Sequence, residues 1–393
     1  MFLVQKHDQD YIKKKNKATV FQLIKSGSPI SRAKIAKTTG MSPTTVGRIV
    51  AALCEQGFVK EVKEAEEAAA TGLGRKATLL KLDRTSVLTA GVELDKSKFK
   101  IGIVDFDGRI INLREVQREV SETVEQTMHR IAEELRAMIE QEQIEPGKII
   151  GMGIGMPGIV DVQNGEVILS AQLGWRNIQV AKTLRELTGY EVAVDNELKV
   201  KALAEHCYGA AKGSKRTALI GFGSGVGSAL IINGEIYRGE TNSAGEIGHT
   251  IVDPNGVMCE CGKIGCLQTY IAESSLIVES NKVKPISTLD ELFEERRKGQ
   301  FWAAGILDRA ITYIGITIAN VICLYNPDTV IVSGDLVEKY EEVRSFFKEN
   351  QLQQYVWEPL WDTYRVVYSA LGSEGVVIGS SLLAQDKFLS IEC

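Results

Sequence analysis

The chain lacks any uninterrupted apolar run of about 18 residues, which is close to the length that a membrane-spanning helix needs. Its first residues, MFLVQKHDQDYIKKK, also lack the apolar core and the small-residue cleavage site of a secretory signal peptide. From these two absences we expect a cytoplasmic protein with no membrane partner.

Neither apolar nor charged residues are unusual in amount, at 44% and 25% of 393 residues. Such values are typical of a soluble globular protein, and the length allows two or three domains. The charge, by contrast, is unevenly distributed. Residues 1–60 carry nine Lys and two Arg against two Asp and one Glu, a net charge of +8. Because the whole chain has −5, the remainder carries −13. This asymmetry indicates that the N-terminal part alone binds a polyanion.

The first 60 residues have the pattern of a helix-turn-helix. An amphipathic segment over residues 11–25 is broken by Gly27 and Pro29. Ser31 is placed to cap a second helix, SRAKIAKTT, which Gly40 ends. Ser42 is placed to cap a third, whose apolar positions Val46, Ile49, Val50 and Leu53 share one face.

A helix with this polar and basic outer face is typical of DNA recognition in the major groove. The following segments FVKEV and ATLLKL predict two strands of a wing, joined by a loop with the tip GLGRK, which suits a minor groove. The candidate DNA-binding residues are Arg32, Ser42, Thr44, Thr45, Arg48, Arg75 and Lys76, with Lys34 as a further phosphate contact. The alternative is a small protein-interaction domain followed by a linker.

From Val87 onward, strand and helix patterns alternate, which favours an α/β fold. VLTAGVEL, FKIGIVD and RIINLREV predict three successive strands, and TALIGFGSGVGSALIINGEIYRG repeats the strand-turn-strand outline. Two such openings in one chain predict two related lobes with a cleft between them. We expect the last helix, near residues 376–384, to pack back on the first lobe.

A metal site is predicted in the segment GHTIVDPNGVMCECGKIGC. Of the seven cysteines, three fall here as Cys259, Cys261 and Cys266, with His249 upstream. One imidazole and three thiolates complete the tetrahedral set that a structural zinc ion prefers, and they leave no open position for catalysis. The alternative is a group of reduced thiols without a metal, as we expect for the scattered Cys54, Cys207, Cys323 and Cys393.

The body resembles the ROK family (repressor, open reading frame, kinase), which contains sugar kinases and sugar-responsive repressors of the actin-like, ribonuclease H-like ATPase fold. The resemblance covers about residues 87–385, and with the winged head it extends to the xylose and N-acetylglucosamine repressors of the family. The motifs that carry it are AGEIGH (244–249), CECGKIGCLQ (259–268), VDNELKVKALAE (194–205), GFGSGVGSALIING (221–234) and MGIGMPGIVD (152–161).

This resemblance implies three parts: a DNA-binding head over residues 1–82, a first lobe over 87–200 completed by a helix at 375–390, and a second lobe over 201–374 that carries the zinc loop. It also implies a set of groups that hydrogen-bond a sugar in the cleft. By residue-wise transfer these are Gly158, Asn196, Glu197, Glu246, His249 and Gln268, although the family usually has Glu at the last position.

The kinase machinery of the family is altered in this chain. Asp95 and Lys96 stand where the kinases have the glycines of their phosphate loop, and Asp95 adds a charge that repels phosphate. Glu197 stands where the kinases use an Asp general base, and Leu198 and Lys199 replace small residues and Asn. In the strand IVSGDL, Asp335 stands where a second glycine is usual.

We therefore expect a sugar-responsive transcriptional repressor without catalytic activity, acting as a homodimer or a dimer of dimers on double-stranded operator DNA. Two alternatives remain: an ATP-dependent sugar kinase with a regulatory head, and a constitutive DNA-binding protein whose cleft is vestigial.

Overall fold

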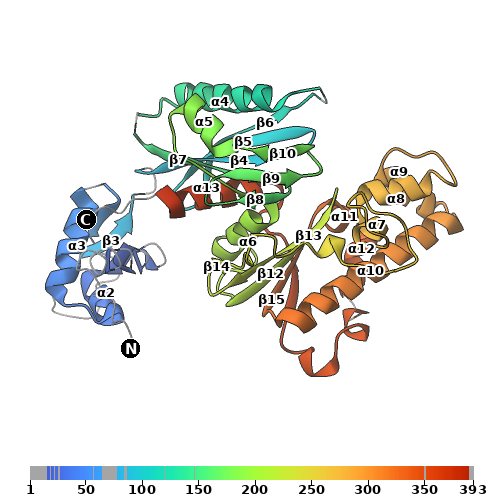
Figure 1. The fold of residues 1–393 in the computed structure, drawn as a ribbon. Helices are drawn as coiled ribbons and strands as arrows, with labels where there is room; N and C mark the ends of the chain where they lie inside the picture. Colours follow the sequence, from blue (N-terminus) through green and yellow to red (C-terminus); the bar gives the residue numbers. More distant parts are fainter. Residues whose placement is uncertain are drawn as a thin grey trace, which may run out of the picture.

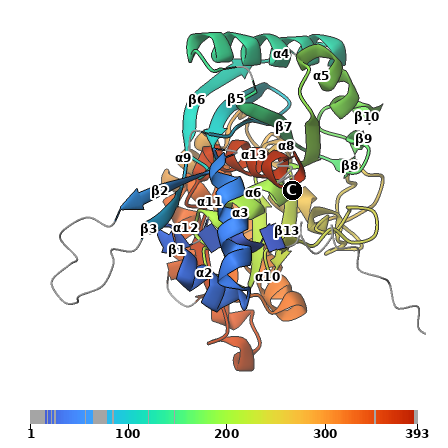
Figure 2. The ribbon, with the colours of Figure 1, turned by 90° about the vertical axis from the view of Figure 1, so that its left-hand side faces the viewer.

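The computed structural model describes residues 16–17, 19–21, 23–24, 27–55, 57–63, 78–83, 86–119, 121–145, 147–348 and 351–388. A small N-terminal head lies beside the end of a larger body made of two lobes (Figures 1 and 2). Arg75 and Lys76, the predicted wing-tip contacts, fall outside the described residues.

The head has the winged arrangement that the sequence predicts. Its elements are β1 (Ile30–Ser31), α2 (Arg32–Thr39), α3 (Pro43–Glu55), β2 (Val59–Lys63) and β3 (Thr78–Leu82), and its sheet has the strand order β1-β3-β2. The Ser31 side chain accepts a hydrogen bond from the Lys34 amide, and Gly40 ends α2 in the left-handed conformation. The Ser42 hydroxyl accepts from the Thr45 amide at 3.1 Å and so caps α3. The four predicted apolar positions of α3 are buried.

The first lobe is built on a mixed five-stranded sheet with the order β11-β7-β4-β5-β6. Its core is formed by the strands together with two helices that cover one face (Figure 1). A small antiparallel sheet, β10-β9-β8, was not predicted, because its strands are only three to five residues long. The elements are β4 (Leu88–Leu94), β5 (Lys98–Asp105), β6 (Ile110–Gln117), α4 (Val124–Gln141), β7 (Ile149–Met156), β8 (Ile159–Asp161), β9 (Glu166–Ser170), β10 (Trp175–Ile178), α5 (Val180–Thr188) and β11 (Val192–Asn196).

The second lobe has a five-stranded sheet with the order β14-β13-β12-β15-β16. Its strands are β12 (Arg216–Phe222), β13 (Val226–Ile232), β14 (Glu235–Ile236), β15 (Thr329–Ser333) and β16 (Arg365–Tyr368). Its helices are α6 (Glu197–Cys207), η2 (Ile247–His249), α7 (Gln268–Ile271), α8 (Glu273–Ser280), α9 (Leu289–Arg297), α10 (Phe301–Tyr325), α11 (Asp335–Glu338), α12 (Glu341–Lys348), η3 (Gln351–Gln354), η4 (Glu358–Leu360) and η5 (Gly372–Glu374).

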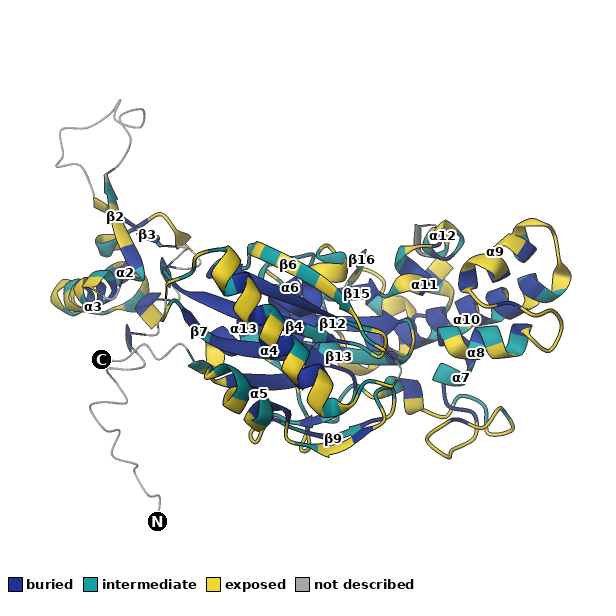
Figure 3. Cartoon of the chain, turned by 90° about the horizontal axis from the view of Figure 1, so that it is seen from above, coloured by how far each residue is buried: buried dark blue, intermediate teal, exposed yellow. Residues whose placement is uncertain are grey.

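The two sheets have the same topology. In each sheet, the first three strands along the chain are antiparallel neighbours. The next two strands lie on the other side of the first strand and run parallel to it. This correspondence confirms the two related lobes that the sequence predicts. Strands of both sheets are largely buried between covering helices (Figure 3).

The last helix, α13 (Gly375–Phe388), packs against β4 and β7 of the first lobe and against α6. Glycine makes this close approach possible: a Cβ added at Gly153 would lie 1.7 Å from the backbone oxygen of Ser380, and one at Gly379 would lie 1.9 Å from that of Val200. The predicted return of the last helix to the first lobe is therefore confirmed, and α13 and α6 form the contact layer between the lobes.

One helix among the described residues, α10, is long and apolar enough to cross a membrane. It carries Asp308 and Arg309, and about half of its residues are buried in the core of the second lobe. A core helix of a globular domain has these same properties.

Candidate functional site

A cavity of about 670 Å³ lies between the lobes. It is lined by the turn after β4, the end of β7, the start of α6, the glycine-rich turn between β12 and β13, and the segment that leads into η2. All six predicted sugar-binding residues line it: Gly158, Asn196, Glu197, Glu246, His249 and Gln268. The fold thus brings together residues that are up to 110 positions apart in the chain.

Asn196 and Gly158 line one side of the cavity. The Asn196 side-chain oxygen accepts hydrogen bonds from the amides of Leu198 and Lys199, so it caps α6. Its amide group donates to the Gly158 carbonyl oxygen at 3.2 Å. Gly158 has φ +112°, and a Cβ there would lie 2.3 Å from the Leu169 carbonyl oxygen. Much of the Asn196 hydrogen-bonding capacity is therefore used to hold two loops of the cavity together.

Glu197 follows as the first residue of α6 and carries the most perturbed carboxyl group of the cavity. Burial, together with the neighbouring charges of Asp95, Glu93 and Glu246, raises its pKa to about 8. Its Oε2 atom is buried without a hydrogen-bond partner among the described residues. At neutral pH Glu197 is mostly protonated, so it can donate as well as accept a hydrogen bond.

The cavity wall is acidic. Seven acidic side chains and a single lysine are among the described residues that line it; the acidic residues are Glu93, Asp95, Glu197, Glu246, Glu260, Glu273 and Asp335. The lysine, Lys201, donates to the Ser333 hydroxyl at 2.6 Å and lies 3.7 Å from Glu338. Asp95 occupies the turn between β4 and β5, where its carboxylate accepts from the Lys96 amide at 2.6 Å. Such a wall repels phosphate groups.

Beside the cavity, four polar residues, three of them buried, form a network between the lobes. Asn242, from the segment after β14, donates to the Val160 carbonyl oxygen at 3.0 Å and to the Asp195 carboxylate at 3.1 Å, both in the first lobe. Its side-chain oxygen accepts from Lys199 at 3.1 Å and from Arg238 at 3.0 Å. Arg238 also pairs with Asp195.

Sequence reasoning noted Lys199 only as a departure from the kinase pattern and missed its partners. Lys199 is 2% exposed, and burial lowers the pKa of its ammonium group. One signal in the sequence could have indicated these partners. Lys199 lies in the first turn of a helix that directly follows the buried strand β11, and a charged group at such a position requires partners.

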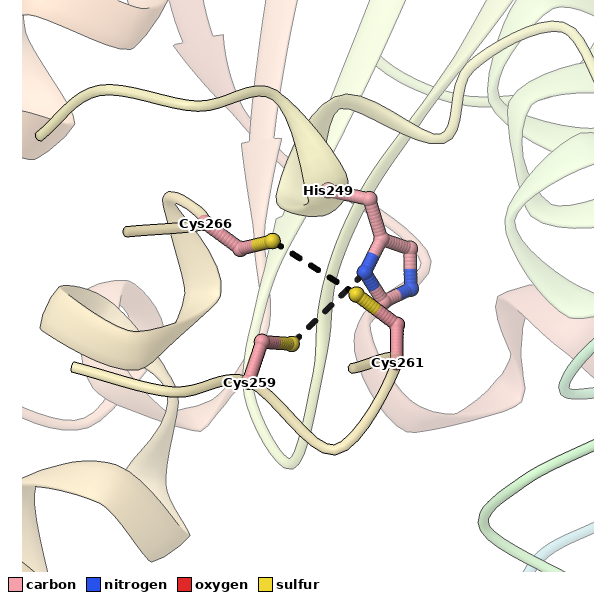
Figure 4. A group of neighbouring side chains, drawn as sticks. All are labelled: His249, Cys259, Cys261 and Cys266. Carbon is pink, nitrogen blue, oxygen red and sulfur yellow. Dashed lines mark hydrogen bonds between the residues drawn. The ribbon is translucent and has the colours of Figure 1, made fainter. Parts of the chain in front are cut away.

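The four predicted metal ligands lie together. Each residue offers one possible ligand atom, and these four atoms all lie within 4.8 Å of one another; the residues are His249, Cys259, Cys261 and Cys266. The Cys259 sulfur lies 3.8 Å from the His249 Nδ1 atom, and the Cys261 and Cys266 sulfurs are 3.6 Å apart (Figure 4). With zinc–sulfur bonds of about 2.3 Å, the ligand atoms of a tetrahedral site are about 3.8 Å apart, so these residues fit a zinc ion.

The loop that holds the cluster is tightly folded and adjoins the cavity. The Cys259 amide donates to the Lys263 carbonyl oxygen at 2.7 Å, and a Cβ at Gly265 would lie 1.6 Å from the Asp253 carbonyl oxygen. His249 ends η2, and Glu246 immediately precedes that helix. With Nδ1 toward the sulfurs, the other ring nitrogen of His249 points away from the cluster (Figure 4).

Gln268 lies between the metal cluster and the cavity. Its amide group donates to the Cys259 sulfur at 3.4 Å and to the Glu260 carboxylate at 3.1 Å. A hydrogen bond to a metal-bound thiolate orients that ligand. The Gln268 side chain therefore links the Cys259 and Glu260 side chains of the loop.

The predicted DNA-binding residues differ in how far they are exposed to solvent. Thr44 and Arg48 of α3 are exposed, as is Lys34 of α2. The Ser42 and Thr45 hydroxyls lie 2.8 Å apart and bond to each other. Arg32 pairs with Glu61 of the wing strand β2, so it braces the wing as well as facing outward.

Comparison with known proteins agrees with this architecture. The ROK family model matches residues 89–387, and the model for a winged helix-turn-helix DNA-binding domain matches residues 19–60. A protein named xylose repressor from Bacillus subtilis (strain 168) is 26% identical over 384 residues and covers 98% of each chain.

Solved structures of the family are similar in fold. A ROK family transcriptional regulator described as a homologue of the E. coli MLC protein gives a TM-score of 0.81 at 21% identity, over 96% of this chain and 97% of that chain. A ROK hexokinase from Thermus thermophilus gives a TM-score of 0.67 at 25% identity, over 77% of this chain and 99% of that chain. The fold expected from the sequence, a winged head on a two-lobed actin-like body, is confirmed. Since the family model spans well over half of its length, this chain belongs to the ROK family.

Proposed function

We propose that the protein is a sugar-responsive, DNA-binding transcriptional repressor of genes for carbohydrate use. The observation that carries the proposal is the combination, in one chain, of a winged head whose recognition helix exposes Thr44 and Arg48 and a ROK body with an interlobe cavity. The similarity to a xylose repressor over 98% of both chains, head included, supports it. Sugar in the cavity lowers the affinity of the head for its operator.

The ligand of the cavity is a neutral sugar in this proposal. Asp95 places a carboxylate at the turn where a kinase of the family would receive phosphate, and Lys201 is engaged by Ser333 and Glu338. Sugar hydroxyls both donate and accept hydrogen bonds, and the raised pKa of Glu197 lets this carboxyl group do the same. Xylose is the first candidate because of the name of the relative, with glucose and N-acetylglucosamine next.

A sugar kinase is the second candidate, because the fold is shared with a ROK hexokinase. Two features of the cavity oppose it. A general base needs a deprotonated carboxylate near neutral pH, whereas burial and nearby acids raise the pKa of Glu197 to about 8. Asp95 also lines the cavity at the turn where kinases of the family have their phosphate loop, and its negative charge would repel the transferred phosphate.

Zinc has a structural role in the proposal. The three thiolates and His249 would hold the ion, which supplies no chemistry beyond fixing the loop. The ordered loop positions Glu246 and the outward-facing edge of His249 at the cavity. The proposal also includes a cytoplasmic homodimer, whose two heads bind half-sites about one turn of DNA apart.

The proposal is tested by two measurements on the full chain. The melting temperature is recorded with xylose, glucose, N-acetylglucosamine and the phosphate ester of each, since a ligand of the native state raises it. We expect a rise with one or more free sugars and none with the esters. ATP is then added with each sugar, and formation of a sugar phosphate would establish the kinase instead. No rise with any sugar would contradict the sugar-responsive function.

A further inference from the structure

One aromatic residue of the first lobe lies in the core of the head. Phe106 is in the turn between β5 and β6, but it is 3% exposed and belongs to the same buried apolar cluster as Val20, Phe21 and Leu53 of the head. Its ring meets that of Phe21 edge to face, with ring centres 5.2 Å apart. The head is thus attached to the body by a buried contact in addition to the chain connection at Val87.

The turn that carries Phe106 is held in a fixed shape. The Asp105 carboxylate accepts from the amides of Asp107 and Arg109, both at 2.9 Å. Asp105 is itself 4% exposed, and its backbone oxygen accepts from the Gln385 side chain of α13 at 3.3 Å. A movement of this turn therefore moves the Phe106 ring with it.

The turn is also attached to α6. The Tyr208 hydroxyl donates to the Phe106 backbone oxygen at 3.2 Å. The Tyr208 ring lies under the turn so closely that a Cβ at Gly108 would be 2.5 Å from it. Tyr208 is the C-cap residue that directly follows α6.

The other end of α6 is in the cavity. Asn196 caps the helix, and Glu197, its first residue, lines the cavity wall. Eleven residues of α-helix span about 16 Å, so one rigid element joins the cavity to the Phe106 turn. Neighbouring α13 packs along α6 and reaches the same turn through Gln385.

We propose that Phe106 and Tyr208 are positioning residues through which α6 sets the orientation of the head according to the state of the cavity. The inference rests on the proposed function and adds the route by which sugar binding in the cavity reaches the head. Sugar that engages Glu197 and Asn196 shifts α6 along or about its axis, Tyr208 shifts the turn, and Phe106 turns the head. A contact that merely anchored the head would stabilise it without depending on sugar.

Two variants separate these roles. Phe106→Leu keeps an apolar side chain in the head core but loses the ring contact with Phe21. Tyr208→Phe keeps the ring under Gly108 and removes only the hydroxyl that donates to Phe106. Tyr325→Phe, at the exposed C-terminal end of α10, is the matched control for loss of a tyrosine hydroxyl.

For each protein, three quantities are measured at one salt concentration. The first is the affinity for the sugar that raises the wild-type melting temperature most, by calorimetry. The others are the affinities for a duplex that the wild-type protein selects from a random-sequence pool, with and without that sugar. The ratio of the two DNA affinities is the sugar response.

We expect the first two variants to bind sugar within about twofold of the wild type, while their sugar response falls from the wild-type value of about fivefold or more to about one. The control keeps the wild-type response. A wild-type response in both variants would overturn the positioning role and leave the repressor function standing. Absence of any response in the wild type would overturn both. Loss of sugar affinity in step with the response would also overturn the inference, because the residues would then shape the cavity itself.

Discussion

The ammonium group of Lys199 donates hydrogen bonds to both oxygens of Asn242, 3.1 Å from the side-chain oxygen. Lys199 stands on α6, two residues after the Glu197 of the cavity, and Asn242 precedes Glu246 by four residues in the second lobe. The pair therefore fixes the distance between two acidic groups that the proposed function assigns to sugar binding.

Replacing this lysine should weaken sugar binding without removing the fold. Lys199→Met keeps the length and apolar stem of the side chain, while Asn242 retains Arg238 as a donor at 3.0 Å. We expect the affinity for sugar to fall by about tenfold, equal to about 1.4 kcal/mol. Calorimetric titration measures this, with the exposed Lys212→Met as control. Unchanged affinity in the Lys199 variant would show that the network does not set the cavity.

The buried carboxyl group of Glu197 gives stability a dependence on pH. Its pKa of about 8 in the folded chain exceeds that of an unfolded Glu, about 4.3, so the folded state binds the extra proton between these values. The stabilisation is complete below about pH 4.3 and is lost as pH rises through 8, with a slope of at most about 1.4 kcal/mol per pH unit.

Urea unfolding of the wild type and of Glu197→Gln, between about pH 5 and about pH 8, measures this difference. The amide does not titrate, so the stability of the wild type relative to the variant should decrease as pH rises. A difference that is constant over the range would mean that Glu197 is already ionised at pH 5.

Removing the metal should loosen the cavity as well as the loop. We expect one zinc ion per chain by elemental analysis, and a lower melting temperature after treatment with a chelator. Cys266→Ser should lose the ion, because the buried Cys266 thiolate is a proposed ligand, whereas Cys323→Ser at an exposed position should keep it. Sugar affinity should fall with the ion, since His249 and Glu246 stand at the edge of the same loop. A protein that binds sugar equally well without zinc would refute this dependence.

On the head, Arg48 should contribute directly to DNA binding. It is exposed on α3, and its side chain makes no hydrogen bond or ion pair within the described part of the chain. If it reads a base edge, Arg48→Ala costs about 1–3 kcal/mol and relaxes specificity at one position. If it contacts a phosphate, the slope of the logarithm of the binding constant against the logarithm of the salt concentration becomes shallower by about one instead. Arg185→Ala, on α5 of the body, should change neither.

Local features were predictable because they depend on neighbours in the chain. Ser31, Gly40 and Ser42 mark helix ends by rules of capping, and the α3 positions are buried at the spacing of one helix face. The Cys259–Cys266 spacing and His249 indicated the cluster in the same way.

Contacts between distant segments were not predictable from spacing. Phe106 has the surroundings of a residue at a hairpin turn, and nothing in DFDG indicates that its ring enters another domain. Arg238 and Asp195 are 43 positions apart and meet only because β11 and the segment after β14 face each other across the lobes. The short strands β8 to β10 carry too few residues for a period-two pattern.

The most direct test of the central claim is the binding of the full chain to its selected DNA duplex at fixed salt, with and without each free sugar. We expect at least one free sugar to lower DNA affinity by about fivefold or more, and its phosphate ester to have no effect. Equal DNA affinity in the presence and absence of every sugar would contradict the account.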